Sequence, residues 1–456
     1  MTDTGFRVAR FSEDYKYIVD SNGRKVSLDD PSVVHVWAID TSPYTSRLMT
    51  NVFHKLGWKT RITGRTTQEV LQYAKNLCSG RECLPCVSMI GATYRDIVEN
   101  RGNNEISLYY NLDQEGPCQN GAWPIVWDTF ARRLKKENIV FLANPGIRNN
   151  YISKGDSIAM ELMTAVITGD IMDEAEASLL CLAKDKEHAM EIFKNETDRV
   201  VDAARNGRSA VKSCLRKWAV NLKKISLKAD IRKTPRVLLF GGLNVMFVHY
   251  PISEYFIGEG IIPKIVDFAE GVLFLESEDL IRYGVKRGIT DPKEQFKTSS
   301  ILRSFFSPKN NLKEAYTTLR MRMHMTIIDR IQRNIRKIAE GSGLVFDRHI
   351  PFLDILCEGH KYVSISGFNE TPVTVGRFVT SLKTNVYDGM INVGSFNCQP
   401  AMNSQAILRS LANKFEVPYT AIDCEGPSIS ANQRRLLETM SVQAKRVREH
   451  KNAFLH

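Results

Sequence analysis

Hydrophobic positions in the first half of the chain alternate between two spacings. Short apolar runs typical of buried strands occur at 33–39, 106–112 and 139–144, and KTRIT follows the pattern of a further strand. Between these runs, apolar residues recur at helical spacing, as in the stretch from Tyr44 to Leu56. Strands that alternate with helices are typical of a parallel sheet covered on both faces. The pattern therefore predicts a first α/β lobe over residues 33–155.

Residues 1–32 differ from this pattern and predict a short N-terminal extension. Asn22 and Gly23 lie between two short apolar stretches, which is a typical signal of a β-hairpin. The extension is therefore expected to form a small antiparallel element outside the first lobe.

The second half begins with a helical region and then returns to strands. Residues 156–232 have helical periodicity and predict a helical connector, and residues 233–456 predict a second α/β lobe. In that lobe, RVLLFGG and GVLFL (271–275) are the first two expected strands, and DGMINVG and YTAID are the last two. A long amphipathic helix is expected from Leu312 to Ile338. The predicted architecture is α/β, with two Rossmann-like lobes joined by helices.

Composition narrows the class of protein. Hydrophobic residues make up 43 % of the chain and charged residues 25 %, as in ordinary globular proteins. No apolar run reaches the roughly 18 residues that span a bilayer, and the N-terminal residues show no secretory signal. We therefore expect a cytoplasmic protein in a reducing compartment. The net charge is +11, but the basic residues are spread along the chain, so direct binding of nucleic acid is not expected.

Three of the nine cysteines share a local setting. An odd number of cysteines in a reducing compartment favours metal ligands, reactive thiols or core residues over disulfides. Cys83 in GRECLPC, Cys118 in EGPCQNG and Cys398 in GSFNCQP each precede a predicted helix. A helix N-terminus lowers the pKa of a thiol and stabilises an anionic cluster. Three thiolates from separate loops suit an iron–sulfur cluster with one iron left open.

Spacing alone leaves alternatives to a cluster. Cys78, Cys83 and Cys86 form a C-x4-C-x2-C pattern that makes a zinc site a rival, although the second tight pair of a zinc site is missing. A free cysteine is also often an ordinary buried residue. This interpretation is favoured for Cys181 and Cys214, which lie on predicted helices, and for Cys357 in LDILCEG.

The cysteine loops, taken with other segments, resemble the 2-hydroxyacyl-CoA dehydratase superfamily. This superfamily includes benzoyl-CoA reductase subunits, activase-related proteins and double-cubane cluster proteins. The similarity runs from about residue 33 to residue 445. The segments that carry it are IDTSPYTSRLMTNVFHKLGWKT, RECLPCVSMIG, EGPCQNGAW, GGLNVMFVHYPISEYFIGEGIIPKI, DGMINVGSFNCQPAMNSQAILRSLANKFEVPYTAIDCEG and NQRRLLE. The order and spacing of these segments, rather than any one of them, make the resemblance specific.

The resemblance implies two flavodoxin-like lobes with an iron–sulfur cluster between them. At the matching positions the cluster ligands are Cys83, Cys118 and Cys398. The cluster is either a 4Fe–4S cubane or the 8Fe–9S double cubane, and the double cubane uses more cysteines. The additional candidates are Cys78, Cys86 and Cys424. Glu82 and Glu115 are nearby carboxylates that are candidates for proton transfer, with helix capping as the alternative.

The function implied by the resemblance is low-potential electron transfer. Family members receive single electrons from a separate dimeric ATPase that carries its own iron–sulfur cluster, and pass them to a small-molecule substrate. The chain has no G-x-x-x-x-G-K-S/T phosphate loop, so ATP hydrolysis is expected in that activator protein. Alternatives are a 2-hydroxyacyl-CoA dehydratase subunit acting on a CoA thioester, and a non-catalytic metal-binding or scaffold protein. Either a homodimer or a pair with a homologous second subunit is expected.

The chain departs from the usual family pattern beside each matched cysteine. The departures are Cys86 and Val87 in the first motif, Gln119 and Asn120 in the second, and Ser395 and Asn397 in the third. These departures leave the three cysteines in place. Because they lie beside the proposed ligands, they indicate that the substrate differs from the usual substrates of the family.

Overall fold

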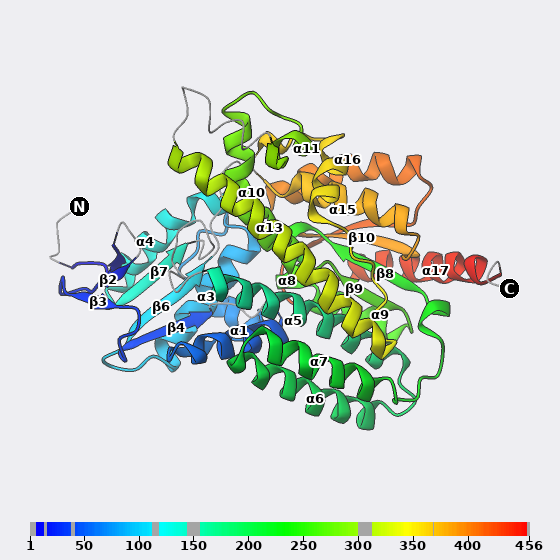
Figure 1. Cartoon of the computed structure of the whole chain (residues 1–456), viewed down its shortest axis with the longest axis horizontal. Coiled ribbons are helices and arrows are strands. Elements are labelled where there is room, and N and C mark those ends of the chain that lie inside the picture. Colours follow the sequence, from blue (N-terminus) through cyan, green and yellow to red (C-terminus); the bar gives the residue numbers. More distant parts are fainter. Residues whose placement is uncertain are drawn as a thin grey trace.

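Two parallel four-stranded sheets, one in each half of the chain, organise the molecule (Figure 1). The computed structural model describes residues 6–12, 16–37, 42–111, 118–143, 156–299, 312–367 and 369–453. The predicted α/β class with two flavodoxin-like lobes is confirmed.

The first sheet has the strand order β5-β4-β6-β7, and all of its pairs are parallel. Its strands are β4 (Val33–Trp37), β5 (Lys59–Ile62), β6 (Ile106–Asn111) and β7 (Ile139–Ala143). Its helices are α1 (Pro43–Lys55), α2 (Gln68–Ala74), α3 (Leu84–Glu99) and α4 (Trp123–Leu134). The first helix begins where expected because the Ser42 hydroxyl accepts the N–H groups of Tyr44 and Thr45, and Pro43 suits the first turn.

A small antiparallel sheet precedes the first lobe. It consists of β1 (Arg10–Phe11), β2 (Tyr17–Val19) and β3 (Lys25–Ser27). The turn between β2 and β3 is held by the Asp20 carboxylate, which accepts the N–H groups of Asn22 and Arg24 at 2.9 and 2.8 Å. Gly23 adopts a φ of +83° there, which an L side chain would strain. The hairpin expected at Asn22 and Gly23 is confirmed.

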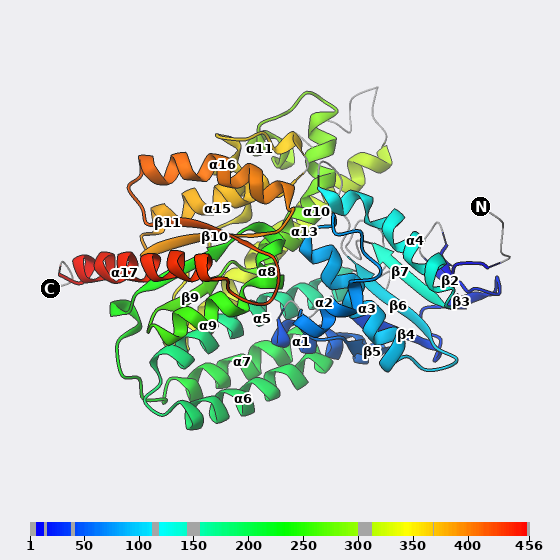
Figure 2. The same ribbon diagram turned by 180° about the vertical axis from the view of Figure 1, so that it is seen from behind.

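The second sheet has the order β11-β10-β8-β9, again with parallel pairs throughout. Its strands are β8 (Arg236–Phe240), β9 (Ile262–Ile265), β10 (Gly389–Ser395) and β11 (Tyr419–Cys424). Its helices are α8 (Val245–Val248), α9 (Tyr250–Gly258), α10 (Phe268–Val285), α11 (Pro292–Gln295), α14 (Phe352–His360), α15 (Thr371–Thr384), α16 (Gln399–Lys414) and α17 (Ala431–Ala453). In Figure 2, α15 and α16 lie above this sheet and α9 lies below it, while α17 contacts α9, β10 and β11.

Long helices connect the two sheets. They are α5 (Asp156–Leu182), α6 (Lys186–Ala203), α7 (Arg208–Leu222) and α13 (Leu312–Ala339). Helix α5 contacts both α1 and β9, so it packs against both lobes. It approaches α1 closely at Gly169, where an added Cβ would lie 2.0 Å from the Thr45 hydroxyl oxygen. Short 3₁₀ turns complete the chain at Gln119–Ala122, Ala204–Asn206, Ile231–Lys233, Gly242–Asn244, Glu340–Ser342 and Ile365–Gly367.

One of the expected strands is wrong. The run GVLFL at 271–275 lies inside helix α10, and the strand that follows β8 is β9. Almost every side of α10 is buried, so its apolar residues form a continuous run that spacing alone does not distinguish from a strand.

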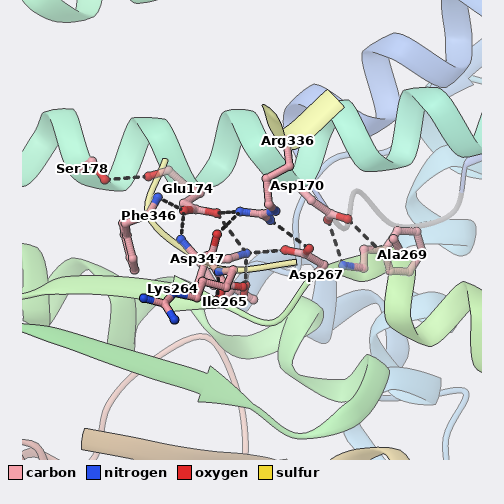
Figure 3. Close-up of polar contacts among 12 residues, drawn as sticks. Asp170, Glu174, Ser178, Lys264, Ile265, Asp267, Ala269, Arg336, Phe346 and Asp347 are labelled. Carbon is pink, nitrogen blue, oxygen red and sulfur yellow. Dashed lines mark hydrogen bonds and ion pairs between the residues drawn. The ribbon is translucent and has the colours of Figure 1, made fainter. Parts of the chain in front are cut away.

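A buried ionic network joins α5, α10 and α13 (Figure 3). The Arg336 guanidinium pairs with Glu174 at 2.9 Å and with Asp267 at 3.1 Å, and Lys264 also pairs with Asp267. Glu174 accepts the N–H groups of Phe346 and Asp347 at 2.6 and 2.8 Å. Asp170 caps α10 by accepting the N–H groups of Phe268 and Ala269 at 2.8 and 3.0 Å. Paired charges of this kind fix how the connecting helices sit against the second sheet.

Candidate cysteine site

One pocket is lined by Cys83, Cys118 and Cys398, which come from three loops that are far apart in the sequence. It encloses about 470 Å³ of empty space, part of which is open solvent. Each of these cysteines occupies the position just before a helical turn: Cys83 before α3, Cys118 before the turn that leads into α4, and Cys398 before α16. The structure thus brings together the three cysteines that the sequence motifs single out.

Proline fixes the start of each of these helices. Pro85, Pro124 and Pro400 lie in the first turns of α3, α4 and α16. Proline suits that position because its missing N–H would have no partner there and its φ is already helical. The residue before such a turn commonly accepts a hydrogen bond from the free backbone N–H groups. Cys83 and Cys398 occupy this position at α3 and α16, whereas Cys118 precedes the 3₁₀ turn that leads into α4. Two helix N-termini and one 3₁₀ turn therefore begin at cysteines that line the same pocket.

Burial raises the pKa of all three thiols. The pKa of Cys118 is raised to about 12, and the pKa values of Cys83 and Cys398 are also raised. The backbone N–H groups of the first helical turns oppose this shift without reversing it. A free thiol in this pocket is therefore protonated at neutral pH, which disfavours a role as a simple nucleophile. A bound metal removes the thiol proton outright, because its positive charge is nearby.

Gln119 joins the three cysteine loops to one another. Its side-chain oxygen accepts the backbone N–H of Cys83 at 2.8 Å. Its side-chain nitrogen donates to the backbone carbonyls of Asn397 at 3.3 Å and Arg81 at 3.4 Å. The Asn397 side chain also donates to the Arg81 carbonyl at 3.4 Å. Gln119 and Asn397 connect the loops that carry the cysteines.

The chemistry of the lining fits an iron–sulfur cluster. Trp123 lines the pocket, and its buried indole N–H has no hydrogen-bond partner within the described residues. The same is true of the Asn120 side-chain oxygen. An indole donor suits thiolate or sulfide acceptors, and apolar neighbours such as Leu243 and Phe247 keep water away.

Within the described residues, no group of three His, Cys, Asp or Glu side chains could hold one metal ion. Thiolates that share one zinc ion lie within about 4 Å of one another, because each Zn–S bond is about 2.3 Å long. In a cluster each thiolate binds a different iron, so the sulfurs lie further apart.

Glu370 is a pocket residue that the sequence reasoning missed. It immediately precedes α15 and lines the pocket with the three cysteines. One carboxyl oxygen accepts the Leu243 N–H at 3.1 Å, and burial raises the pKa of Glu370 to about 7. In the sequence, Glu370 lies before Thr-Pro and has the appearance of an ordinary helix cap. Its nearness to the cysteines arises from the fold alone.

The packing of α14 against α15 holds Glu370 in place. At Gly359, an added Cβ would lie 1.8 Å from the Pro372 carbonyl oxygen, and at Gly376 it would lie 1.9 Å from the Ile355 carbonyl oxygen. Only glycine allows the two backbones to approach this closely. The N-terminus of α15, and with it Glu370, is therefore fixed beside the pocket.

The other candidate residues lie outside the pocket lining. Cys86 is buried in the first turn of α3, near Cys78, while Cys424 is buried at the end of β11. Burial acts to raise the pKa of Glu82, but backbone N–H groups led by that of Ser79 lower it below its ordinary value. Glu82 is thus an ionised carboxylate that accepts backbone hydrogen bonds within its own loop. Glu115 lies outside the described residues.

The three remaining cysteines are separate from the pocket. Cys181, Cys214 and Cys357 lie on α5, α7 and α14, as expected for residues of helices. None of them lines the cysteine pocket.

Comparisons with known proteins found no match among family models and no significant match among curated proteins. Among the described helices, none is both long enough and apolar enough to cross a membrane.

Proposed function

We propose that this chain is an iron–sulfur protein of low-potential electron transfer, with Cys83, Cys118 and Cys398 as cluster ligands. The observation that carries the proposal is the single pocket lined by these three cysteines, each at the start of a helical turn. The motif resemblance supports the same role, that of a component that passes single electrons to a small-molecule substrate.

The side chains and helix ends around the pocket each contribute to cluster binding or electron transfer in this proposal. The three sulfurs hold the group, and the helix N-termini stabilise its negative charge. When bound, a cluster accepts and donates single electrons. Gln119 fixes the distances between the loops through its contacts with Cys83 and Asn397. Burial excludes water and strengthens each of these electrostatic interactions.

Glu370 is suited to proton transfer at the same pocket. With its pKa raised to about 7, its carboxyl group exists in both protonation states near neutral pH. A general acid or base works best when its pKa lies near the working pH. One of its oxygens is held by Leu243, so the other is the atom that would give a proton to a reduced substrate or take one from it.

Electrons are proposed to come from a separate ATP-hydrolysing iron–sulfur activator. The chain lacks a phosphate loop of the P-loop type, so a partner would couple ATP hydrolysis to electron delivery. A homodimer or a homologous second subunit is proposed for the working assembly, and a CoA thioester is the proposed class of substrate.

Variants of the cysteines test the ligand assignment. Protein purified without oxygen is expected to be brown, with broad visible absorption from thiolate-to-iron charge transfer. Cys118→Ala should abolish this absorption, whereas Cys181→Ala, which removes a buried cysteine far from the pocket, should preserve it. Equal absorption in the two variants would rule out Cys118 as a ligand.

A further inference from the structure

A large groove lies at the end of the second sheet opposite to the cysteine pocket. It encloses about 1940 Å³ of empty space, part of which is open solvent. It is lined by the segment before β8, the loop after α13, the turn before β10 and the last part of α17. Cys398 follows the other end of β10, so roughly 20 Å of strand separates the groove from the cysteine pocket at about 3.3 Å per residue. The groove is therefore a separate site.

Positive charge predominates in the lining of this groove. The cationic side chains are Arg232, Arg236, Arg348, Arg448 and Lys451, and the carboxylates are Asp230, Glu340 and Asp347. Several of these charges are already paired. Arg448 and Lys451 both bind Asp388, at 2.8 and 3.1 Å, and Arg232 pairs with Asp230 at 3.1 Å.

Arg236 is a buried cation of the groove that is not paired in this way. It is only 8 % exposed, and within the described residues its guanidinium has no ion pair and no hydrogen bond. It lies over the Phe346 ring at 5.2 Å from the ring centroid, which fixes the plane of the guanidinium. Burial, and then the charge of Arg448, lower the pKa of Arg236 to about 10. The group therefore remains charged at neutral pH.

A buried cation without a partner is unfavourable unless an anion satisfies it. The planar fork of a guanidinium matches two oxygens of a phosphate group, and Arg is the residue best suited to that contact. Arg348 is exposed at the same groove and adds a second positive charge. Val345, Phe346 and Val386 give the groove apolar surface that suits the organic part of a ligand.

We propose that this groove binds the phosphate group of a small phosphorylated molecule, with Arg236 as its central contact. The site lies apart from the cysteine pocket, so the proposal is independent of electron transfer. Inorganic phosphate and a nucleoside diphosphate share the chemistry that Arg236 recognises. They differ in whether an organic part can occupy the apolar surface beside Phe346.

Calorimetric titration of the full chain tests this proposal with inorganic phosphate and with ADP as the probes. Saturable binding of at least one of them is expected. Arg236→Gln should weaken that binding about 10- to 100-fold, the usual effect of losing hydrogen bonds to a charged group. Arg435→Gln removes an exposed charge from α17 outside the groove and should leave binding unchanged. Tighter binding of ADP than of phosphate would assign the groove to a nucleotide-like ligand, and equal binding would assign it to phosphate itself.

A second variant and a stability measurement separate a lost contact from a lost fold. Arg348→Gln changes an exposed side chain and should weaken binding several-fold without affecting folding. Because the Arg236 guanidinium has no ion pair or hydrogen bond in the described part of the chain, Arg236→Gln should unfold at a temperature no lower than that of the wild-type protein when no phosphate is present. Absence of saturable binding to the wild-type protein, or equal binding to wild type and Arg236→Gln, would overturn the proposal.

Discussion

Gln119 connects the cysteine loops, so its replacement by methionine should loosen the cluster site without unfolding the protein. Methionine has nearly the same length and volume as glutamine, but it cannot make the hydrogen bonds to Cys83, Asn397 and Arg81. The change therefore removes polar contacts between loops and leaves the packing almost intact.

The size of the effect follows from the three contacts. The bond to the Cys83 N–H is short, at 2.8 Å, and its loss leaves a donor of a buried residue without its partner. That loss costs about 1–3 kcal/mol. The other two contacts, at 3.3 and 3.4 Å, are long and contribute less. A loss of about 1–3 kcal/mol corresponds to roughly 5- to 150-fold weaker retention of the bound group.

The assay follows the loss of visible absorption after an excess of iron chelator is added without oxygen. Gln119→Met should lose its absorption markedly faster than the wild-type protein, while its unfolding temperature stays close to the wild-type value. Gln443→Met, on the exposed surface of α17, is the matched control and should behave as wild type. Equal rates for Gln119→Met and wild type would refute the idea that Gln119 holds the ligand loops together.

Two further predictions concern the buried charges near the second sheet. Arg336→Leu leaves Glu174 without its main partner and leaves Asp267 with Lys264 alone, so the urea midpoint should fall by the equivalent of about 3–5 kcal/mol. An unchanged midpoint would contradict the network in Figure 3. Burial raises the pKa of Glu270 to about 7 from an ordinary value of 4.5, so the folded state holds this proton more tightly than the unfolded state. Wild-type stability should therefore fall by up to about 3 kcal/mol as pH rises from 4.5 through 7. In Glu270→Gln this part of the pH dependence should vanish, and a wild-type pH profile in the variant would show that Glu270 is not the group responsible.

Much of the secondary structure follows from local signals in the sequence. The first helix is delimited by Ser42, Pro43 and Gly57, and the hairpin turn is set by Gly23. Helix α10 was mistaken for a strand because spacing reports only one-sided burial, and this helix is buried on nearly every side. Length and neighbouring turns, rather than periodicity, distinguish the two cases.

Some features of the candidate site also follow from local sequence, whereas others depend on the tertiary fold. The setting of Cys83, Cys118 and Cys398 before helices is local, and the nearby prolines signal it. The contribution of Glu370 depends on the crossing of α14 and α15, which no short segment specifies. In the sequence, Arg236 is simply the first residue of a strand, and its missing partner becomes apparent only when the segments around the groove are assembled.

The measurement that tests the central claim most directly is the iron and acid-labile sulfide content of the wild-type chain, purified and reconstituted without oxygen. We expect about four irons with about four sulfides per chain for a single cubane, or about eight irons for a double cubane. Cys118→Ala should retain neither iron nor sulfide. A colourless wild-type protein that contains zinc and no sulfide after the same treatment would show that the three cysteines do not hold an iron–sulfur cluster.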